Sequence, residues 1–263
     1  MQDILDIQEQ GGVMRLTMNR PERLNALNPA LATALRECFQ ALYRRKDIRV
    51  VILQGAGRSF CAGLDLKEQA PGKSVGAAEM MEVQYSIRDI MIAMRRCPQP
   101  IISVVQGAAS GGGFALALAS DIRLATPDAR MNASFLRIGL TGCDMGVSYF
   151  LPRMVGSSVA AQYLLTGRFM DAQRAHSLGL VSMVADLDVL HAEAQALAQD
   201  MLRTNPLGLR LTKEALGHSL DMGSLEAVMA MEDRQQILCT QSEDFTEGMQ
   251  AFLEKREPRY TGR

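Results

Sequence analysis

Two loops made of small residues are the stretches of this sequence best suited to chemistry. The first, Gly107–Gly113, follows the apolar run Ile101–Val105 and passes directly into the helix-compatible residues Phe114–Ala117. Glycines at a helix start let another molecule approach the backbone, and the N–H groups of the first turn point outward without helical partners. The loop predicts a site that stabilises negative charge, although a tight strand-to-helix turn would use the same glycines.

A second apolar run, Val50–Leu53, also ends in a small-residue loop, which contains Ala62 and Gly63. Two such loops can direct two backbone N–H groups at one oxygen atom. Donors fixed in a dry site act on charge that develops only during a reaction, which is the principle of an oxyanion hole. The pair of loops therefore favours an enzyme that stabilises an oxyanion.

Composition argues against several other classes of protein. The chain has 263 residues and a formal net charge of -1, and its Lys and Arg residues form no basic stripe, so nucleic acid is not an expected partner. No apolar run reaches the roughly 18 residues of a membrane span, and the first residues lack the basic start of a signal peptide. We expect a cytoplasmic protein that does not bind membranes.

Cysteine and histidine are placed unfavourably for metal or triad chemistry. The five cysteines are widely separated and form no C-x-x-C motif, so neither a disulfide framework nor a zinc site is expected. The three histidines, His176, His191 and His218, lie far in sequence from both loops. A metal site and a Ser-His-Asp triad are therefore not predicted.

Periodicity and breaker residues predict the elements that position the loops. A hairpin of strands 4–8 and 13–18 opens the chain, and Asn28-Pro29 starts a helix that runs to 44. Further strands are expected at 50–54, 121–125 and 130–132, and further helices at 77–96, from about 147, and at 187–203, 206–219, 223–240 and 242–256. Strand, strand and helix recur about every 45 to 50 residues, which is typical of a coiled stack of similar units.

The helix expected at 77–96 is rich in methionine, and the segment before it, 70–76, is expected to be mobile. An apolar stripe on a helix usually faces the core. Methionine also adapts to irregular ligands, so at least one of these residues is a candidate for lining a binding pocket.

Four motifs occur in one order along the whole chain: NRPERLNAL, SFCAGLDL, VVQGAASGGGFALALASDIRLA and LTGRFMDAQRAHSLGLVSMV. They resemble the crotonase (enoyl-CoA hydratase/isomerase) superfamily. The resemblance implies an α/β fold, a spiral of repeated ββα units over residues 1–200 that carries an acyl-CoA site. It also implies a helical region over 201–263 for trimerisation and active-site cover. A homotrimer or a dimer of trimers is expected.

The resemblance also implies which residues bind substrate. Ala62 and Gly112 match the two oxyanion donors, which would hold the thioester carbonyl of an acyl-CoA and stabilise its enolate. Coenzyme A enters as part of the substrate, and no other cofactor is expected. The residues expected to contact CoA or the acyl group are Arg23, Ala62, Gly63, Leu64, Asp65, Leu66, Lys67, Gly111, Phe135 and Met145.

The acid/base residues separate members of the family. Ala115 and Phe135 stand where hydratases of the family carry two glutamates, so hydration by the usual two-glutamate mechanism is not expected. Asp144 remains as the candidate acid/base, in a loop where related isomerases and a dehalogenase place an aspartate. Alternatively, Asp144 caps the helix that follows it. A second carboxyl group from the variable region, Glu68, Glu82 or Asp89, is a further possibility.

Three functions follow from these residues. The first is isomerisation of an enoyl-CoA double bond, with Asp144 as base and acid in an apolar surrounding such as Phe135, Met145 or Tyr149. The second is other enolate chemistry on CoA thioesters, including ring-opening hydrolysis of a carbon–carbon bond or a residual hydratase activity. The third is an acyl-CoA-binding protein without catalysis.

Overall fold

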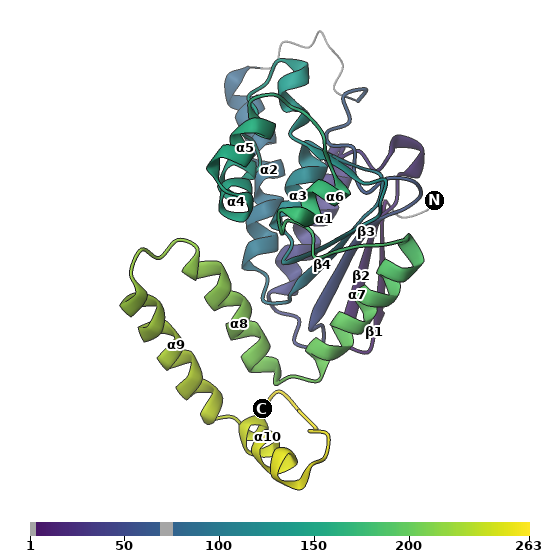
Figure 1. Cartoon of the computed structure of the whole chain (residues 1–263). Helices are drawn as coiled ribbons and strands as arrows, with labels where there is room; N and C mark the ends of the chain where they lie inside the picture. The colour runs from purple at the N-terminus through teal and green to yellow at the C-terminus, as the bar shows by residue number, and fades with distance from the viewer. Residues whose placement is uncertain (1–3, 69–75) are drawn as a thin grey trace.

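A six-stranded sheet forms the centre of the computed structural model, which describes residues 4–68 and 76–263 (Figure 1). The strand order is β1-β2-β3-β4-β6-β9, with β1 antiparallel to β2 and every other pair parallel. The strands are β1 Leu5–Gln10, β2 Val13–Met18, β3 Val50–Gly55, β4 Ile101–Val105, β6 Ile122–Ala125 and β9 Met183–Val184. Residues 70–75 of the segment expected to be mobile lie outside the described residues.

A second, smaller sheet contains β5 (Ala108–Ser110), β7 (Arg130–Asn132) and β8 (Met170–Asp171). Cys61 joins it through a parallel bridge to β5. The chain passes from β3 through Cys61 to α2 (Ala77–Arg96), and then repeats the order strand, strand, helix twice more. Successive turns of this spiral therefore place neighbouring strands in both sheets. This arrangement confirms the expected spiral. Its repeat is less regular than predicted, since β2, β3 and β4 begin at Val13, Val50 and Ile101.

Helices cover both faces of the large sheet, as is usual where strands run parallel. They are α1 Pro29–Leu42, α2 Ala77–Arg96, α3 Gly112–Ala119, α4 Val147–Val155, α5 Ser157–Leu164, α6 Ala172–Ser177 and α7 Leu187–Leu202, with short 3-10 helices at Pro21–Arg23 (η1) and Ser134–Ile138 (η2). The Asn28 side chain accepts a hydrogen bond from Leu31 N–H at 2.9 Å and so caps α1, as the Asn-Pro pair predicted.

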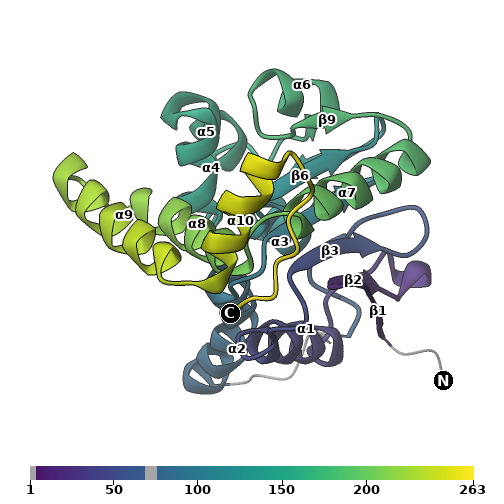
Figure 2. The ribbon, with the colours of Figure 1, turned by 90° about the horizontal axis from the view of Figure 1, so that it is seen from below.

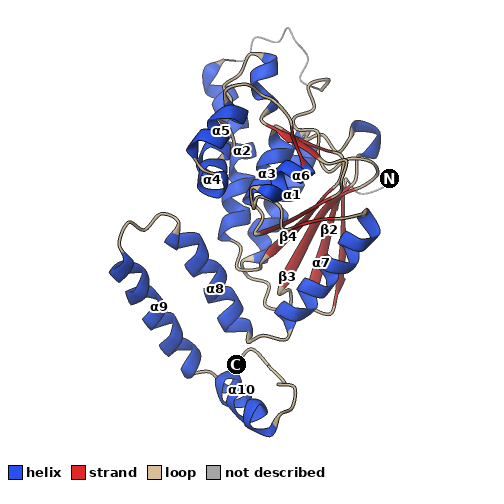
Figure 3. Ribbon diagram, in the orientation of Figure 1, coloured by secondary structure: helices blue, strands red, loops and turns tan. Residues whose placement is uncertain are grey.

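Alternate residues of the central strands pack into two different hydrophobic clusters. Val51 and Leu53 of β3 face the cluster that α1, α2, α3 and α4 complete, whereas Val50 and Ile52 face α7. Figures 2 and 3 show α7 alone along one side of the sheet, with the other helices of the core gathered on the opposite side. Because both faces are buried, the strands read as continuous apolar runs in the sequence.

The chain after α7 forms a helical region that extends away from the core (Figure 1). It contains α8 Pro206–Ser219, α9 Leu225–Thr240 and α10 Glu243–Glu254. Lys213 is the buried residue of α8, and α9 buries no residue within the described chain. Large apolar side chains such as Leu225 and Phe252 are 74% and 82% exposed. This region therefore presents apolar surface that the described chain does not cover.

Candidate active site

The two small-residue loops are in direct backbone contact. The Cys61 N–H donates to the Ala108 carbonyl oxygen, and the Cys61 carbonyl oxygen accepts from the Ser110 N–H, both at 3.0 Å. A Cβ atom added at Gly113 would stand 2.0 Å from that same Cys61 oxygen. Glycine is required at 113 because the two backbones approach too closely for any side chain.

The tips of the two loops also meet. Gly63 has a φ of +95°, in the left-handed region, and a Cβ atom added there would lie 3.5 Å from the backbone nitrogen of Gly112. This turn brings the residue after Gly63 next to the start of α3. The sequence-based expectation that both loops serve one site agrees with this geometry.

The N–H of Ala62 is not available to a ligand, because it donates to the Leu24 carbonyl oxygen at 3.0 Å. The prediction of Ala62 as an oxyanion donor is therefore wrong. The N–H of Gly63 is directed at the Cys61 thiol. Within residues 4–68 and 76–263, the N–H groups of Leu64 and Gly112 have no hydrogen-bond acceptor. Both groups are therefore available to a ligand.

Arg20 fixes the first loop and was missed by sequence reasoning. Its guanidinium donates to Asp65 Oδ2 at 2.9 Å, to Glu68 Oε1 at 2.6 Å and to the Ala26 carbonyl oxygen at 2.5 Å. Burial alone would raise the pKa of Asp65, but hydrogen bonds from Arg20 and the Lys67 N–H lower it. Removing one partner of such a buried pair typically costs about 3 to 5 kcal/mol. The Asp65 side chain thus holds the loop.

Asp144 lies just before α4, but its side chain does not cap that helix. The Val147 N–H donates to the backbone carbonyl oxygen of Asp144 at 2.9 Å, and the N-cap position is Gly146. The Oδ1 atom instead accepts from the Met145 N–H at 2.7 Å. The alternative interpretation of Asp144 as a helix cap is therefore wrong.

The backbone beside Asp144 is strained. Met145 has a φ of +50°, a left-handed conformation that is rare for a residue with a side chain. Such strain costs on the order of 1 to 3 kcal/mol and persists only where the surroundings enforce it. Met145 is buried, and a Cβ atom added at Gly112 would stand 3.2 Å from its sulfur. The Met145 side chain thus connects the Asp144 loop to the glycine loop.

Phe135 packs beside the glycine loop, and Asp144 is partly buried. Phe135 is buried, and a Cβ atom added at Gly111 would stand 3.3 Å from its Cε1 atom. Ala115 is fully buried one turn into α3. Partial burial raises the pKa of the Asp144 carboxyl, although hydrogen bonds from the Met145 N–H and the Gln84 side chain oppose the effect.

Gln84 of α2 is the second side chain that sequence reasoning missed. Its Nε2 atom donates to Asp144 Oδ1 at 2.5 Å. At 3.6 residues per turn, Glu82 and Asp89 stand roughly 200° and 140° around α2 from Gln84, so they point away from Asp144. Asp89 pairs with Arg88, and Glu68 pairs with Arg20. The Asp89 and Glu68 carboxylates thus have other partners, and Gln84 is the α2 side chain that contacts Asp144.

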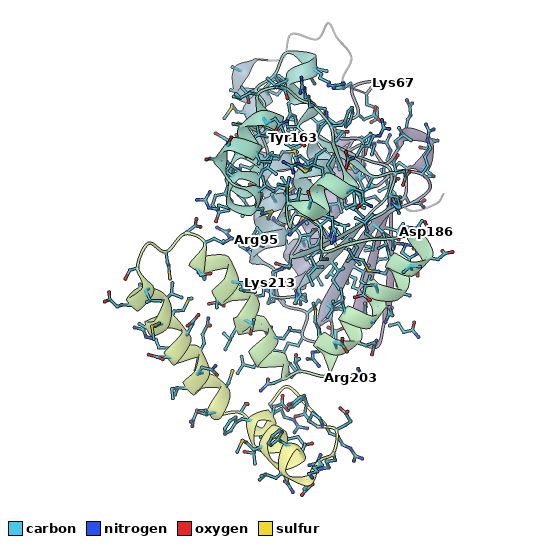
Figure 4. All side chains as sticks on the ribbon, in the orientation of Figure 1. Lys67, Arg95, Tyr163, Asp186, Arg203 and Lys213 are labelled. Carbon is cyan, nitrogen blue, oxygen red and sulfur yellow. The ribbon has the colours of Figure 1, made fainter. Side chains whose placement is uncertain are left out.

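The expected CoA-binding residues lie around the first loop. Arg23 ends η1 and is exposed, as are Leu66 and Lys67. Part of the main chain expected to contact CoA is already used. The Gly63 carbonyl oxygen accepts from the Leu27 N–H, and the Asp65 N–H donates to the Leu27 carbonyl oxygen. Figure 4 places Lys67 at the end of the core far from α8.

A cavity of about 1140 Å³ lies between α2, α4 and α8. Its lining includes Met91, Met145, Tyr149 and Phe150. Met91 of the predicted helix lines this cavity, and both Met91 and Met94 pack in the core. The volume exceeds the roughly 300 to 1,000 Å³ of common small-molecule pockets.

A partly buried ion-pair cluster attaches α8 to the core beside this cavity. Lys213 Nζ lies 2.9 Å from Asp121 Oδ2, and Arg95 of α2 lies 3.2 Å from Oδ1 of the same carboxylate. Lys213 also donates to the Gln99 carbonyl oxygen at 2.7 Å. Figure 4 shows Arg95 and Lys213 where α8 meets the core.

The fold and the paired loops define a family. The family model of enoyl-CoA hydratase/isomerase matches residues 8–263, and the chain belongs to this family, the crotonase superfamily. It is 37% identical over 253 residues to 1,2-epoxyphenylacetyl-CoA isomerase of Escherichia coli (strain K12), with 96% of each chain covered. The sequence-based identification of the superfamily and of the fold is confirmed.

Solved structures show the same fold over the whole chain. The crystal structure of an enoyl-CoA hydratase from Bacillus anthracis has a TM-score of 0.93 and 32% identity, with 100% of each chain covered. That of an enoyl-CoA hydratase from Polaromonas sp. JS666 has a TM-score of 0.91 and 31% identity, with 98% of this chain and 99% of that chain covered. Among the described residues, no helix is both long and apolar enough to cross a bilayer.

Proposed function

We propose that this protein isomerises the double bond of an enoyl-CoA, with Asp144 moving the proton. One observation carries the proposal. Asp144 is a half-buried carboxylate, and the next residue, Met145, packs its sulfur against Gly112, whose backbone N–H is free. A carboxyl group with a raised pKa beside an oxyanion site is suited to accept and return one proton.

The free N–H groups of Leu64 and Gly112 are the proposed oxyanion donors, with Leu64 in the role first given to Ala62. The thioester carbonyl oxygen would accept from both. Loss of one donor of such a pair typically costs about 3 to 4 kcal/mol of transition-state stabilisation. The contact between Cys61 and Gly113 fixes the spacing of the two loops before substrate arrives.

The proposed reaction balances without any added group. Asp144 removes a proton from C2 of a 3-enoyl thioester, and the negative charge spreads over C2, C4 and the carbonyl oxygen. The same carboxyl group then delivers the proton to C4, which leaves the double bond between C2 and C3. CoA takes part only as the thioester of the substrate. Arg23 and Lys67 are the proposed contacts of its phosphates.

The acyl group is proposed to extend past Met145 into the cavity between α2, α4 and α8. Tyr149 and Phe150 line this cavity with their rings 5.1 Å apart at 87°. These aromatic side chains, with the similarity to 1,2-epoxyphenylacetyl-CoA isomerase of Escherichia coli, favour a second candidate, isomerisation of a ring-containing acyl-CoA.

The helical region after residue 200 is proposed to associate with further copies of this chain, as a trimer or a dimer of trimers. Its exposed Leu225, Phe252 and Leu253 favour burial against protein rather than water. A second copy of this chain is the proposed partner of this apolar surface, because the region follows the core in the same chain and the family resemblance implies self-association.

Spectrophotometric assays of 3-enoyl-CoA, 2-enoyl-CoA and 1,2-epoxyphenylacetyl-CoA test the function. We expect wild type to convert 3-enoyl to 2-enoyl thioesters or to isomerise the epoxide, and Asp144→Asn to lose about 100-fold or more in kcat. Asp89→Asn, which removes an exposed carboxylate on α2, is the matched control and should retain full activity. A wild type that binds these thioesters without converting any of them would contradict the proposal.

An amide-to-ester replacement tests the donor assignment, because it removes one backbone N–H and leaves the side chain. At Leu64 it should lower kcat by about 100- to 1,000-fold. At Ala62 it should mainly lower stability by about 1 kcal/mol, the net contribution of one hydrogen bond. The opposite pattern would restore Ala62 as the donor.

A further inference from the structure

Gln84 is a polar side chain on an otherwise apolar stripe of α2. The following members of the stripe, Ile87, Met91 and Met94, are buried one, two and three turns further along. An apolar side chain at 84 would continue the stripe by the same helical spacing. The amide instead reaches a residue 60 positions later in the chain, Asp144.

The two oxygens of the Asp144 carboxyl group are in different situations. Oδ1 accepts from the Met145 N–H at 2.7 Å and from Gln84 Nε2 at 2.5 Å. Within the described parts of the chain, Oδ2 has no hydrogen-bond donor. Two donors from different elements therefore fix the plane of the carboxyl group and leave one oxygen for a proton.

We propose that Gln84 is a positioning residue, which holds Oδ1 of Asp144 while Oδ2 accepts and returns the proton. The inference rests on the isomerase function proposed above. The amide Nε2 donates to Oδ1 whether Oδ2 is ionised or protonated, so the carboxyl group keeps its orientation through both proton transfers. The Met145 N–H alone would leave rotation about the bond to the carboxyl group less restrained.

Other titratable groups around Asp144 have partners of their own. On α2, Arg88 pairs with Asp89. On α4, the Tyr149 hydroxyl donates to Asp221. In η2, Arg137 donates to the Gly167 carbonyl oxygen. The residues of α3 carry no titratable side chain, and Cys143, next to Asp144, is exposed. Burial and the two donors are the influences on the pKa of Asp144.

The test compares Gln84→Leu and Gln84→Glu with the control Glu82→Gln on another face of α2. Loss of the donor in Gln84→Leu should raise the pKa of Asp144, so the acid limb of the kcat/KM profile moves to higher pH. Gln84→Glu should move it further, since two adjacent carboxylates resist ionising together. We expect kcat to fall by about 10-fold in Gln84→Leu with KM almost unchanged. Glu82→Gln should leave the acid limb of the kcat/KM profile at the same pH as in wild type.

A measurement without turnover separates this inference from the proposed function. The carboxyl ¹³C resonance of Asp144, identified by its absence in Asp144→Asn, is titrated in wild type and in Gln84→Leu. A higher pKa in Gln84→Leu supports the role of Gln84, and an unchanged pKa overturns it. A wild type without activity on any enoyl thioester removes the isomerase function. An active wild type whose acid limb is unmoved in Gln84→Leu removes only the inference about Gln84.

Discussion

Gly113 offers a quantitative test of how closely the two loops must approach. In Gly113→Ala the new Cβ atom would stand 2.0 Å from the Cys61 carbonyl oxygen, and real Cβ contacts below 3.0 Å essentially do not occur. The loops would have to separate by about 1 Å, since the obstacle is backbone and cannot rotate away. Overpacking of this kind typically costs about 1 to 3 kcal/mol, and we expect the upper end.

The same separation should move the Gly112 N–H away from the Leu64 N–H. A misplacement of about 1 Å at a catalytic group can cost about 100-fold in rate. We therefore expect Gly113→Ala to lose about 100-fold in kcat/KM in the enoyl-CoA isomerase assay. Urea unfolding followed by circular dichroism measures the loss of stability independently of activity.

Two further glycines provide graded controls. In Gly112→Ala the new Cβ atom meets the ends of the Leu27 and Met145 side chains at 2.8 and 3.2 Å, which can turn aside, so the loss of stability should be smaller. In Gly208→Ala, early in α8, the nearest atom is 3.7 Å away, and stability should rise by up to about 1 kcal/mol. A Gly113→Ala protein as stable and as active as wild type would refute the reasoning.

Three more predictions concern charge, thiol reactivity and assembly. Burial raises the pKa of Asp144, so its ionisation destabilises the fold. Asp144→Asn should therefore unfold at the same or a higher urea concentration than wild type at neutral pH. This gain in stability should vanish as the pH falls below the pKa of Asp in the unfolded chain. Iodoacetamide should label the exposed Cys143 in the native protein but not Cys61, because burial raises the pKa of the Cys61 thiol to about 12. Peptide mass spectrometry measures the labelling, and faster labelling of Cys61 than of Cys143 would contradict this prediction. Phe252→Glu should shift the protein to smaller species in light scattering after size-exclusion chromatography, and an unchanged mass would contradict self-association through α10.

The sequence predicted the elements well because local signals specify them. The apolar run before Gly107 and the Asn28-Pro29 pair mark a strand end and a helix start without help from distant residues. The same signals located both loops of the site. Fold and superfamily could therefore be predicted from the sequence.

Pairing between distant residues could not be predicted in the same way. Which N–H of the first loop stays free depends on Leu24 and Leu27, which occupy the N–H groups of Ala62 and Asp65. The contact between Gln84 and Asp144 joins residues 60 positions apart, and no local pattern indicates it. Sequence motifs therefore located the loop, whereas the particular donor required the fold.

The backbone contact at Gly113 also bears on how such a protein can change during evolution. The two small-residue loops are held together by main-chain atoms, so nearly any side chain introduced at the contact would be removed by selection. The proposed acid/base group, Asp144, stands on a different loop, before α4, and its partner Gln84 stands on a separate helix. Substitutions at those two places can accumulate without disturbing the loops. New reactions on the same thioester scaffold should therefore arise by exchange of residues such as 84 and 144, with the glycine loop inherited intact.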